Sequence, residues 1–154
     1  MKQKDRASVL VRTLLALCGL LGSTGALAQL APGYLTPAVG LHIEAFQTNH
    51  EGELVDAIHR ARGRCSAIII NPGAFTHYAW SLHDALAAFT GPVAVMVGDE
   101  DTVTPVDVAG RTAGAARDAV LVVIPGVGHL SAVEDPAAVA AALEALAARA
   151  DAAG

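Results

Sequence analysis

The chain has 154 residues, of which 53% are hydrophobic but only 4% aromatic, and its formal net charge is −5. This length supports one domain with a real core, and an aliphatic core favours α/β layers over a β-sandwich. The acidic balance argues against nucleic acid or an anionic membrane as a partner. The histidines lack metal-ligand spacing and Gly126-Val-Gly128 lacks the third glycine of a dinucleotide loop, so neither a metal nor a cofactor is expected.

Residues 1–28 have the pattern of a secretory signal peptide. Basic residues precede an apolar run at 13–21, and Ala26-Leu-Ala28 offers a cleavage site before Gln29. The location would be secreted or periplasmic if the signal is used, and cytoplasmic otherwise. The alternative is a buried first helix. The run is too short for a stable membrane anchor, and residues 29–40, rich in proline and glycine, are predicted to form a linker.

Residues 41–150 alternate between strand-like and helix-like patterns and are predicted to form a single α/β domain. We expect strands at 42–47, 67–70, 93–97 and 120–124. The intervening helices run from a cap at Asn49 to Gly63, over 77–88, over 107–116, and from Asp135-Pro136 towards Arg149. This order predicts a three-layer, flavodoxin-like open parallel sheet of about four strands, with helices on both faces.

Polar residues follow three of the predicted strands. Asn71 comes after the run Ala67-Ile-Ile-Ile70, and Asp101 and His129 come after the next two strands. In an open α/β sheet, ligands bind in the crevice outside the carboxyl ends of the strands. These side chains are therefore candidate site residues. The alternative is that they belong to ordinary polar connections.

Three motifs resemble type II 3-dehydroquinate dehydratase over about residues 43–95. They are Gln47-Thr-Asn-His-Glu-Gly-Glu-Leu-Val-Asp-Ala-Ile-His59, Ala67-Ile-Ile-Ile-Asn-Pro-Gly-Ala-Phe-Thr-His77 and Tyr78-Ala-Trp-Ser-Leu-His-Asp-Ala-Leu86. The resemblance implies a lyase that dehydrates 3-dehydroquinate to 3-dehydroshikimate in the shikimate pathway. It implies that Asn71, His77 and Asp84 bind a small polyhydroxy carboxylate. In the family, the residue matching Asp84 reaches into a neighbouring subunit's site, which implies a homo-oligomer.

The residues that transfer protons in that family have no counterpart here. The family's Gly-Pro-Asn first strand and its lid Arg and Tyr are missing. Where its general-acid His would stand in Glu-x-His-x-Ser, this chain has Val95-Met-Val-Gly-Asp99. We therefore expect an impaired dehydratase, in which His129 is the one candidate to replace the acid.

Residues 92–150 instead resemble the C-terminal part of an α/β-hydrolase. The motifs are Val95-Met-Val-Gly-Asp-Glu-Asp-Thr-Val-Thr-Pro105 and Leu121-Val-Val-Ile-Pro-Gly-Val-Gly-His-Leu-Ser131. The resemblance implies that Asp101 orients a catalytic His129, but no serine lies in a Gly-x-Ser-x-Gly motif. The chain therefore looks chimeric, whether by natural fusion, truncation or artificial joining. A hydrolase-like fragment and a non-catalytic binding module remain alternative functions.

Overall fold

The computed structural model describes residues 8–12, 42–44, 46 and 48–153. Their five strands form one parallel sheet in the order β2-β1-β3-β4-β5, which is the flavodoxin-like order. The strands are β1 (Ser8–Arg12), β2 (His42–Ile43), β3 (Ala67–Ile70), β4 (Val93–Gly98) and β5 (Ala119–Ile124). The helices are α2 (Glu51–Ala61), the 3-10 helix η1 (Gly73–His77), α3 (Trp80–Ala88), α4 (Val106–Ala115), α5 (Ser131–Glu134) and α6 (Pro136–Ala153). The predicted fold class is confirmed.

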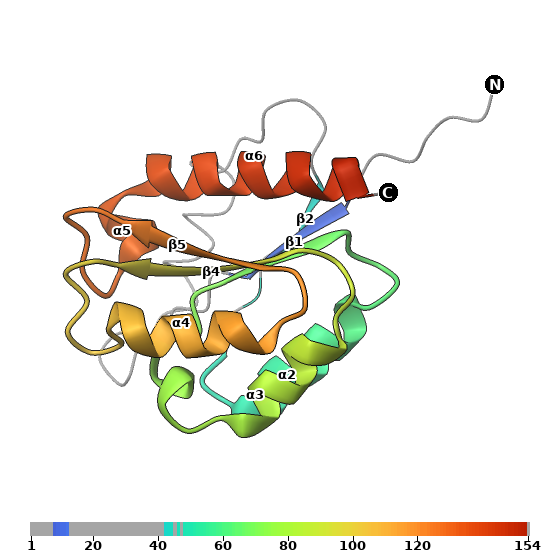
Figure 1. Cartoon of the computed structure of the whole chain (residues 1–154), viewed down its shortest axis with the longest axis horizontal. Helices are drawn as coiled ribbons and strands as arrows, with labels where there is room; N and C mark the ends of the chain where they lie inside the picture. The colour runs from blue at the N-terminus through green and yellow to red at the C-terminus, as the bar shows by residue number, and fades with distance from the viewer. Residues whose placement is uncertain (1–7, 13–41, 45, 47, 154) are drawn as a thin grey trace.

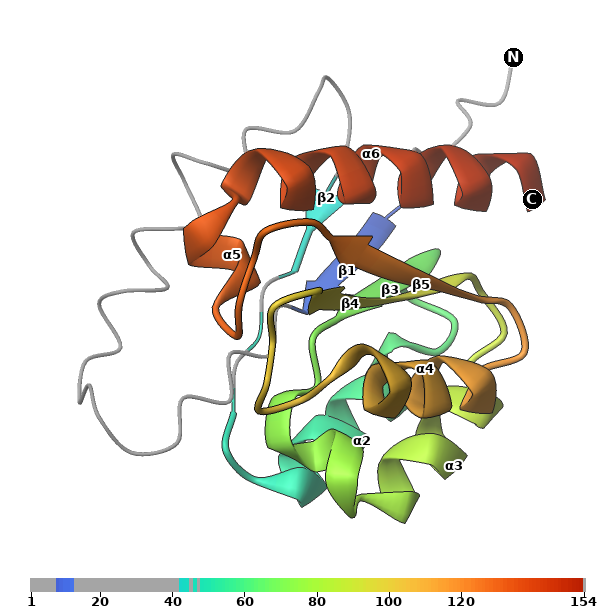
Figure 2. The same cartoon turned by 60° about the vertical axis from the view of Figure 1, so that its left-hand side comes forward.

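Helices cover both faces of the sheet, so the molecule has three layers (Figures 1 and 2). On one face, α2, α3 and α4 pack over a cluster that includes Leu54, Leu82 and Phe89. On the other face, α6 packs over a second cluster that includes Ile69 and Leu143. Every residue of β3 and β4 is buried, as expected for inner strands of a parallel sheet. None of the helices in the described part of the chain is long and apolar enough to cross a membrane.

The strand register places the predicted polar residues on one edge of the sheet. Ile70 lies beside Val95, and Gly98 lies beside Ile124, so β3, β4 and β5 end on the same side. Asn71, Asp101 and His129 follow these three strands. Their expected placement at the carboxyl edge is therefore confirmed, whereas their roles remain predictions.

The N-terminal segment differs from its prediction. Ser8–Arg12 forms β1, which pairs with β2 on one side and with β3 on the other. Residues 8–12 therefore do not lie outside the α/β domain, and they are a strand rather than part of a buried first helix. The β-branched Val9 and Val11 favour an extended backbone, and the pairing satisfies amide and carbonyl groups of β3. The remainder of the predicted signal peptide and the linker at 29–40 lie outside the described residues.

Several helix and strand boundaries also differ from those predicted from the sequence. β2 covers 42–43 rather than 42–47, and the N-cap of α2 is His50 rather than Asn49. The Thr48 hydroxyl accepts the His50 amide in the turn before this helix. The predicted helix at 77–88 is broken: η1 ends at His77, and α3 begins at Trp80. His77 and Asp84 therefore lie on two different helices rather than on the one helix predicted over 77–88.

Candidate active site

Asp101 and His129, in the loops that follow β4 and β5, form a partly buried hydrogen-bonded pair. His129 Nδ1 lies 2.9 Å from Asp101 Oδ2, and Asp101 is 4% exposed. Because a carboxylate only accepts hydrogen bonds, Nδ1 carries the proton. The other ring nitrogen, Nε2, then faces away from the carboxylate, and among the described residues it has no hydrogen-bond partner. It is the nitrogen available for proton transfer.

Asp101 is held by four hydrogen bonds. Its Oδ1 accepts the amides of Val103 at 2.9 Å and Thr104 at 2.8 Å, and its Oδ2 accepts the Thr104 hydroxyl at 2.6 Å and the His129 ring. Burial alone raises the pKa of Asp101. The hydrogen bonds from Thr104, together with the hydrogen bond and charge of His129, outweigh that effect and lower its pKa. Asp101 is therefore the anionic partner that fixes the His129 ring.

Asn71 links the end of β3 to the start of α5, the helix that follows the His129 loop. Its Oδ1 accepts the Gly73 amide at 3.0 Å, which shapes the turn into η1. Its Nδ2 lies 3.4 Å from the hydroxyl of Ser131, and both residues are buried. The two segments that resemble different families thus meet in a direct side-chain contact.

His77 makes a second link between those segments. Its Nε2 donates to the Val103 carbonyl at 2.8 Å, and the Val103 amide donates to Asp101. The single residue Val103 therefore connects the His77 ring to the carboxylate that holds His129. Asp84 is not part of this network: it lies exposed on α3.

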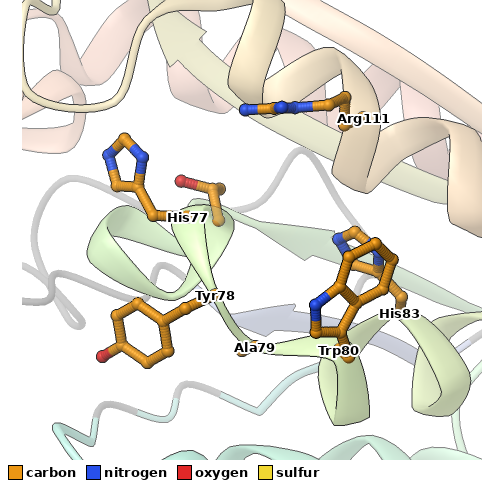
Figure 3. Close-up of a pocket in the computed structure, with 7 residues that line it drawn as sticks. His77, Tyr78, Ala79, Trp80, His83 and Arg111 are labelled. Carbon is orange, nitrogen blue, oxygen red and sulfur yellow. The ribbon is translucent and has the colours of Figure 1, made fainter.

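A small pocket of about 60 Å³ opens between η1, the start of α3 and α4. Figure 3 shows Arg111 reaching over it from α4, with the Tyr78 ring directed to the opposite side of η1 from the His77 ring. The seven residues that line it are Thr76, His77, Tyr78, Ala79, Trp80, His83 and Arg111. Arg111 makes no ion pair with any described residue. Its guanidinium can therefore receive a carboxylate or another small anion.

Sequence reasoning missed the residues that hold the His129 loop. Glu134 accepts the amides of Gly128 and Leu130, each at 2.8 Å, and so clamps both neighbours of His129. A Cβ on Gly98 would lie 1.9 Å from the Val127 carbonyl oxygen, so only glycine lets this loop approach β4. The strand-ending Gly98 was a usable signal, whereas an isolated Glu134 gave none.

Within the described ranges there is no group of His, Cys, Asp or Glu side chains that could hold a metal ion. The chemistry that these residues can perform is proton transfer at His129 Nε2 and anion binding near Arg111. Fold and site thus define an open α/β protein with a polar, histidine-containing site at the carboxyl edge of a parallel sheet.

Within this class, residues 28–98 match the family model of class II dehydroquinases. The 3-dehydroquinate dehydratase 2 of Pseudomonas putida is 58% identical over 69 residues, which are 44% of this chain and 46% of that protein. The 3-dehydroquinate dehydratase of Bacillus cytotoxicus is 53% identical over 55 residues, which are 36% of this chain and 38% of that protein. The resemblance to type II dehydroquinases is confirmed. The chain spans less than half the length of these curated relatives.

Two solved structures share the fold. The type II dehydroquinase of Propionibacterium acnes superposes with a TM-score of 0.62 at 24% identity, over 92% of this chain and 98% of that one. A CIB-like hydrolase from Thermoplasma acidophilum superposes with a TM-score of 0.60 at 12% identity, over 96% of this chain and 89% of that one. The chain thus shares its fold with a type II dehydroquinase and with a CIB-like hydrolase.

Proposed function

We propose that this chain is a 3-dehydroquinate dehydratase-like lyase with strongly reduced turnover, which binds a small cyclic polyhydroxy carboxylate at the carboxyl edge of β3, β4 and β5. One observation carries the proposal: Asn71 and His77, from the dehydroquinase-like segment, are hydrogen-bonded to Ser131 and to the loop that holds Asp101. The segment that resembles dehydratases thus supplies binding groups beside a histidine that can transfer a proton.

The binding groups suit a hydroxylated anion. Arg111 offers a planar set of donors for a carboxylate, and the Nδ1 of His77 is free to accept a hydroxyl hydrogen because its Nε2 donates to Val103. Asn71 is 5% exposed, and each of its amide atoms already has one partner. Its contribution to binding is therefore chiefly to hold the turn before η1 and the Ser131 hydroxyl in place.

His129 would act as the general acid. In its doubly protonated form, Nε2 gives a proton to the hydroxyl β to the ketone, which leaves as water, while Asp101 stabilises the imidazolium. A base must remove the proton α to the ketone. Tyr78, the tyrosine among the described residues, is 59% exposed, and its ring points away from His77 (Figure 3). Without a positioned base we expect the rate to be about 10²–10⁴-fold lower than that of a complete site.

The test measures binding and turnover separately. Calorimetry with 3-dehydroquinate at millimolar concentration should show weak binding that falls in His77→Ala and Arg111→Ala. The exposed His59 on α2 supplies the matched control, and His59→Ala should bind as the unmodified chain does. Absorbance of the conjugated product should show a slow rate that His129→Gln abolishes. Binding without any turnover would indicate the non-catalytic module, and no binding would reject the proposal.

A second candidate is an acyl hydrolase, which the Asp101–His129 geometry favours. The difficulty is the nucleophile. The side chain that follows β3 is the amide of Asn71, and the Thr104 hydroxyl lies 3.4 Å from Nδ1, on the side that faces Asp101. His129-dependent hydrolysis of p-nitrophenyl acetate, with an acetylated protein seen by mass spectrometry, would support this candidate instead.

A further inference from the structure

The edge strand β5 is apolar and lacks the residues that usually protect the edge of a sheet from pairing with another chain. It lies at the end of the sheet order, so only β4 pairs with it among the described residues. Its sequence, Ala-Val-Leu-Val-Val-Ile, contains no charge, proline or glycine. Val120 and Val123 are 36% and 40% exposed. Soluble proteins usually protect such an edge with lysine, proline or a bulge, because its unpaired backbone groups can pair with another chain.

The hydrogen bonds to β4 show which backbone groups of β5 are unpaired. The carbonyl of Asp118 accepts the Val93 amide, and the carbonyl of Ile124 accepts the Asp99 amide. Because N–H and C=O groups alternate in direction along a strand, the even-numbered residues face β4. Ala119, Leu121 and Val123 therefore direct their amides and carbonyls away from the sheet.

We propose that β5 pairs with β5 of a second copy of this chain, antiparallel and centred on Leu121, to form one continuous sheet across a two-fold axis. This register places Leu121 opposite itself and Ala119 opposite Val123. Each of these outward-facing residues then meets an outward-facing residue of the second copy, and all six groups of each strand are paired. The two-fold symmetry makes the contact self-complementary and closed, unlike an open fibre.

Charges at the ends of the strand fit a second copy rather than an unrelated partner. In the proposed register Arg117 lies opposite Pro125, the residue after β5. The register of β4 and β5 ends with Gly98 beside Ile124, and its continuation by one residue sets Asp99 beside Pro125. Two strand spacings separate Arg117 from Asp99 of the other copy, roughly 10 Å between Cα atoms, which two long side chains can span. Arg117 is exposed and makes no ion pair within the described chain, and one Asp99 oxygen accepts only the Gly126 amide. The pair occurs twice by symmetry.

The test uses the full chain and measures its mass by sedimentation at rising concentration. We expect a dimer that dissociates on dilution. Val123→Lys and Arg117→Glu should each raise the dissociation constant about tenfold or more, equivalent to about 1.4 kcal/mol. Arg62→Glu, at an exposed arginine after α2, is the matched control and should leave the constant unchanged. Circular dichroism confirms that each variant is folded.

Hydrogen exchange tests the register independently of mutation. The amides of Leu121 and Val123 should become protected as the concentration rises, whereas those of Val120 and Val122 should be protected at every concentration by β4. A chain that stays monomeric at the highest soluble concentration would overturn the proposal. So would a dimer that is unaffected by Val123→Lys, or protection that does not alternate along β5. The proposal does not depend on the lyase assignment.

Discussion

The substitution Asp101→Asn tests whether the carboxylate at the end of β4 organises the site. Asparagine keeps the shape of aspartate but replaces one acceptor oxygen with an NH₂ group. The retained oxygen can still accept the Val103 and Thr104 amides. The NH₂ group would then face the Thr104 hydroxyl and His129 Nδ1, both of which donate to the carboxylate.

The loss can be sized from these contacts. A hydrogen bond to a charged group contributes about 1.5–3 kcal/mol, and two are affected, but both donors can turn into acceptors and recover part of the loss. We expect a destabilisation of about 2–4 kcal/mol. For a chain of this size each kcal/mol lowers the melting temperature by about 2–4 °C, so the fall should be about 4–16 °C. The His129 ring should also change tautomer, because Nδ1 would have to accept.

Thermal unfolding followed by circular dichroism measures the first effect, and ¹⁵N chemical shifts of His129 measure the second. In the unmodified chain the neutral ring should be protonated on Nδ1, and in Asp101→Asn on Nε2. Asp56→Asn on the exposed face of α2 is the matched control and should change neither measurement. Equal melting temperatures and an unchanged tautomer in Asp101→Asn would refute the inferred Asp101–His129 geometry.

Four further predictions concern the stability of the folded chain. Gly98→Ala should destabilise the chain by about 1–3 kcal/mol, because a Cβ would lie 1.9 Å from the Val127 carbonyl oxygen. The control Gly114→Ala, in open space on α4, should be neutral or stabilising by up to about 1 kcal/mol. Equal effects of the two substitutions in urea unfolding would contradict the close approach of the Val127 carbonyl to Gly98. Glu134→Gln leaves one acceptor for two amides and should lose about 1 kcal/mol and broaden the His129 resonances, while the exposed Glu144→Gln should do neither. The pKa of Asp101 is lowered in the folded chain, so this carboxylate stabilises the fold above its unfolded pKa of about 3.9, and the stabilisation is lost as the pH falls through the folded pKa. In Asp101→Asn the free energy of unfolding should therefore depend less steeply on pH in the acid range. A chain beginning at Gln29, as export would leave it, lacks β1 and should unfold at a lower urea concentration than the full chain; equal midpoints would show that β1 contributes no stability.

The inner part of the fold could be predicted because its sequence signals are local. The continuous apolar runs of β3 and β4 are buried at every residue, as a strand between two helical layers requires. Helix α6 begins at Pro136, as predicted from the pair Asp135-Pro136, and the Asp135 carboxylate accepts the Ala138 amide at 2.9 Å. The strand-end position of Asn71, Asp101 and His129 followed from the parallel sheet.

What could not be predicted depends on contacts between distant residues. The basic start and small-residue pattern of residues 1–28 indicated a signal peptide, yet Ser8–Arg12 is placed by pairing with β3, some sixty residues away. The break between η1 and α3 falls at Tyr78 and Ala79, whose backbone angles are not helical. The preceding 3-10 turn is held by the Asn71 side chain and by the Thr76 hydroxyl, which donates to the Gly73 carbonyl at 2.7 Å. Helical spacing across residues 77–88 gave no sign of it.

The contact between Asn71 and Ser131 bears on how two unlike segments can share one domain. A parallel sheet brings the carboxyl ends of all its strands to a common edge, whatever the origin of each strand. The dehydroquinase-like segment ends within β4 or at its last residue, and the hydrolase-like segment includes the loop after β4 and all of β5. The resemblance therefore changes within one strand of the core rather than between two domains. Polar groups from both segments must then meet at the edge, and they do so through Ser131 and Val103, although neither segment was complete as a site by itself.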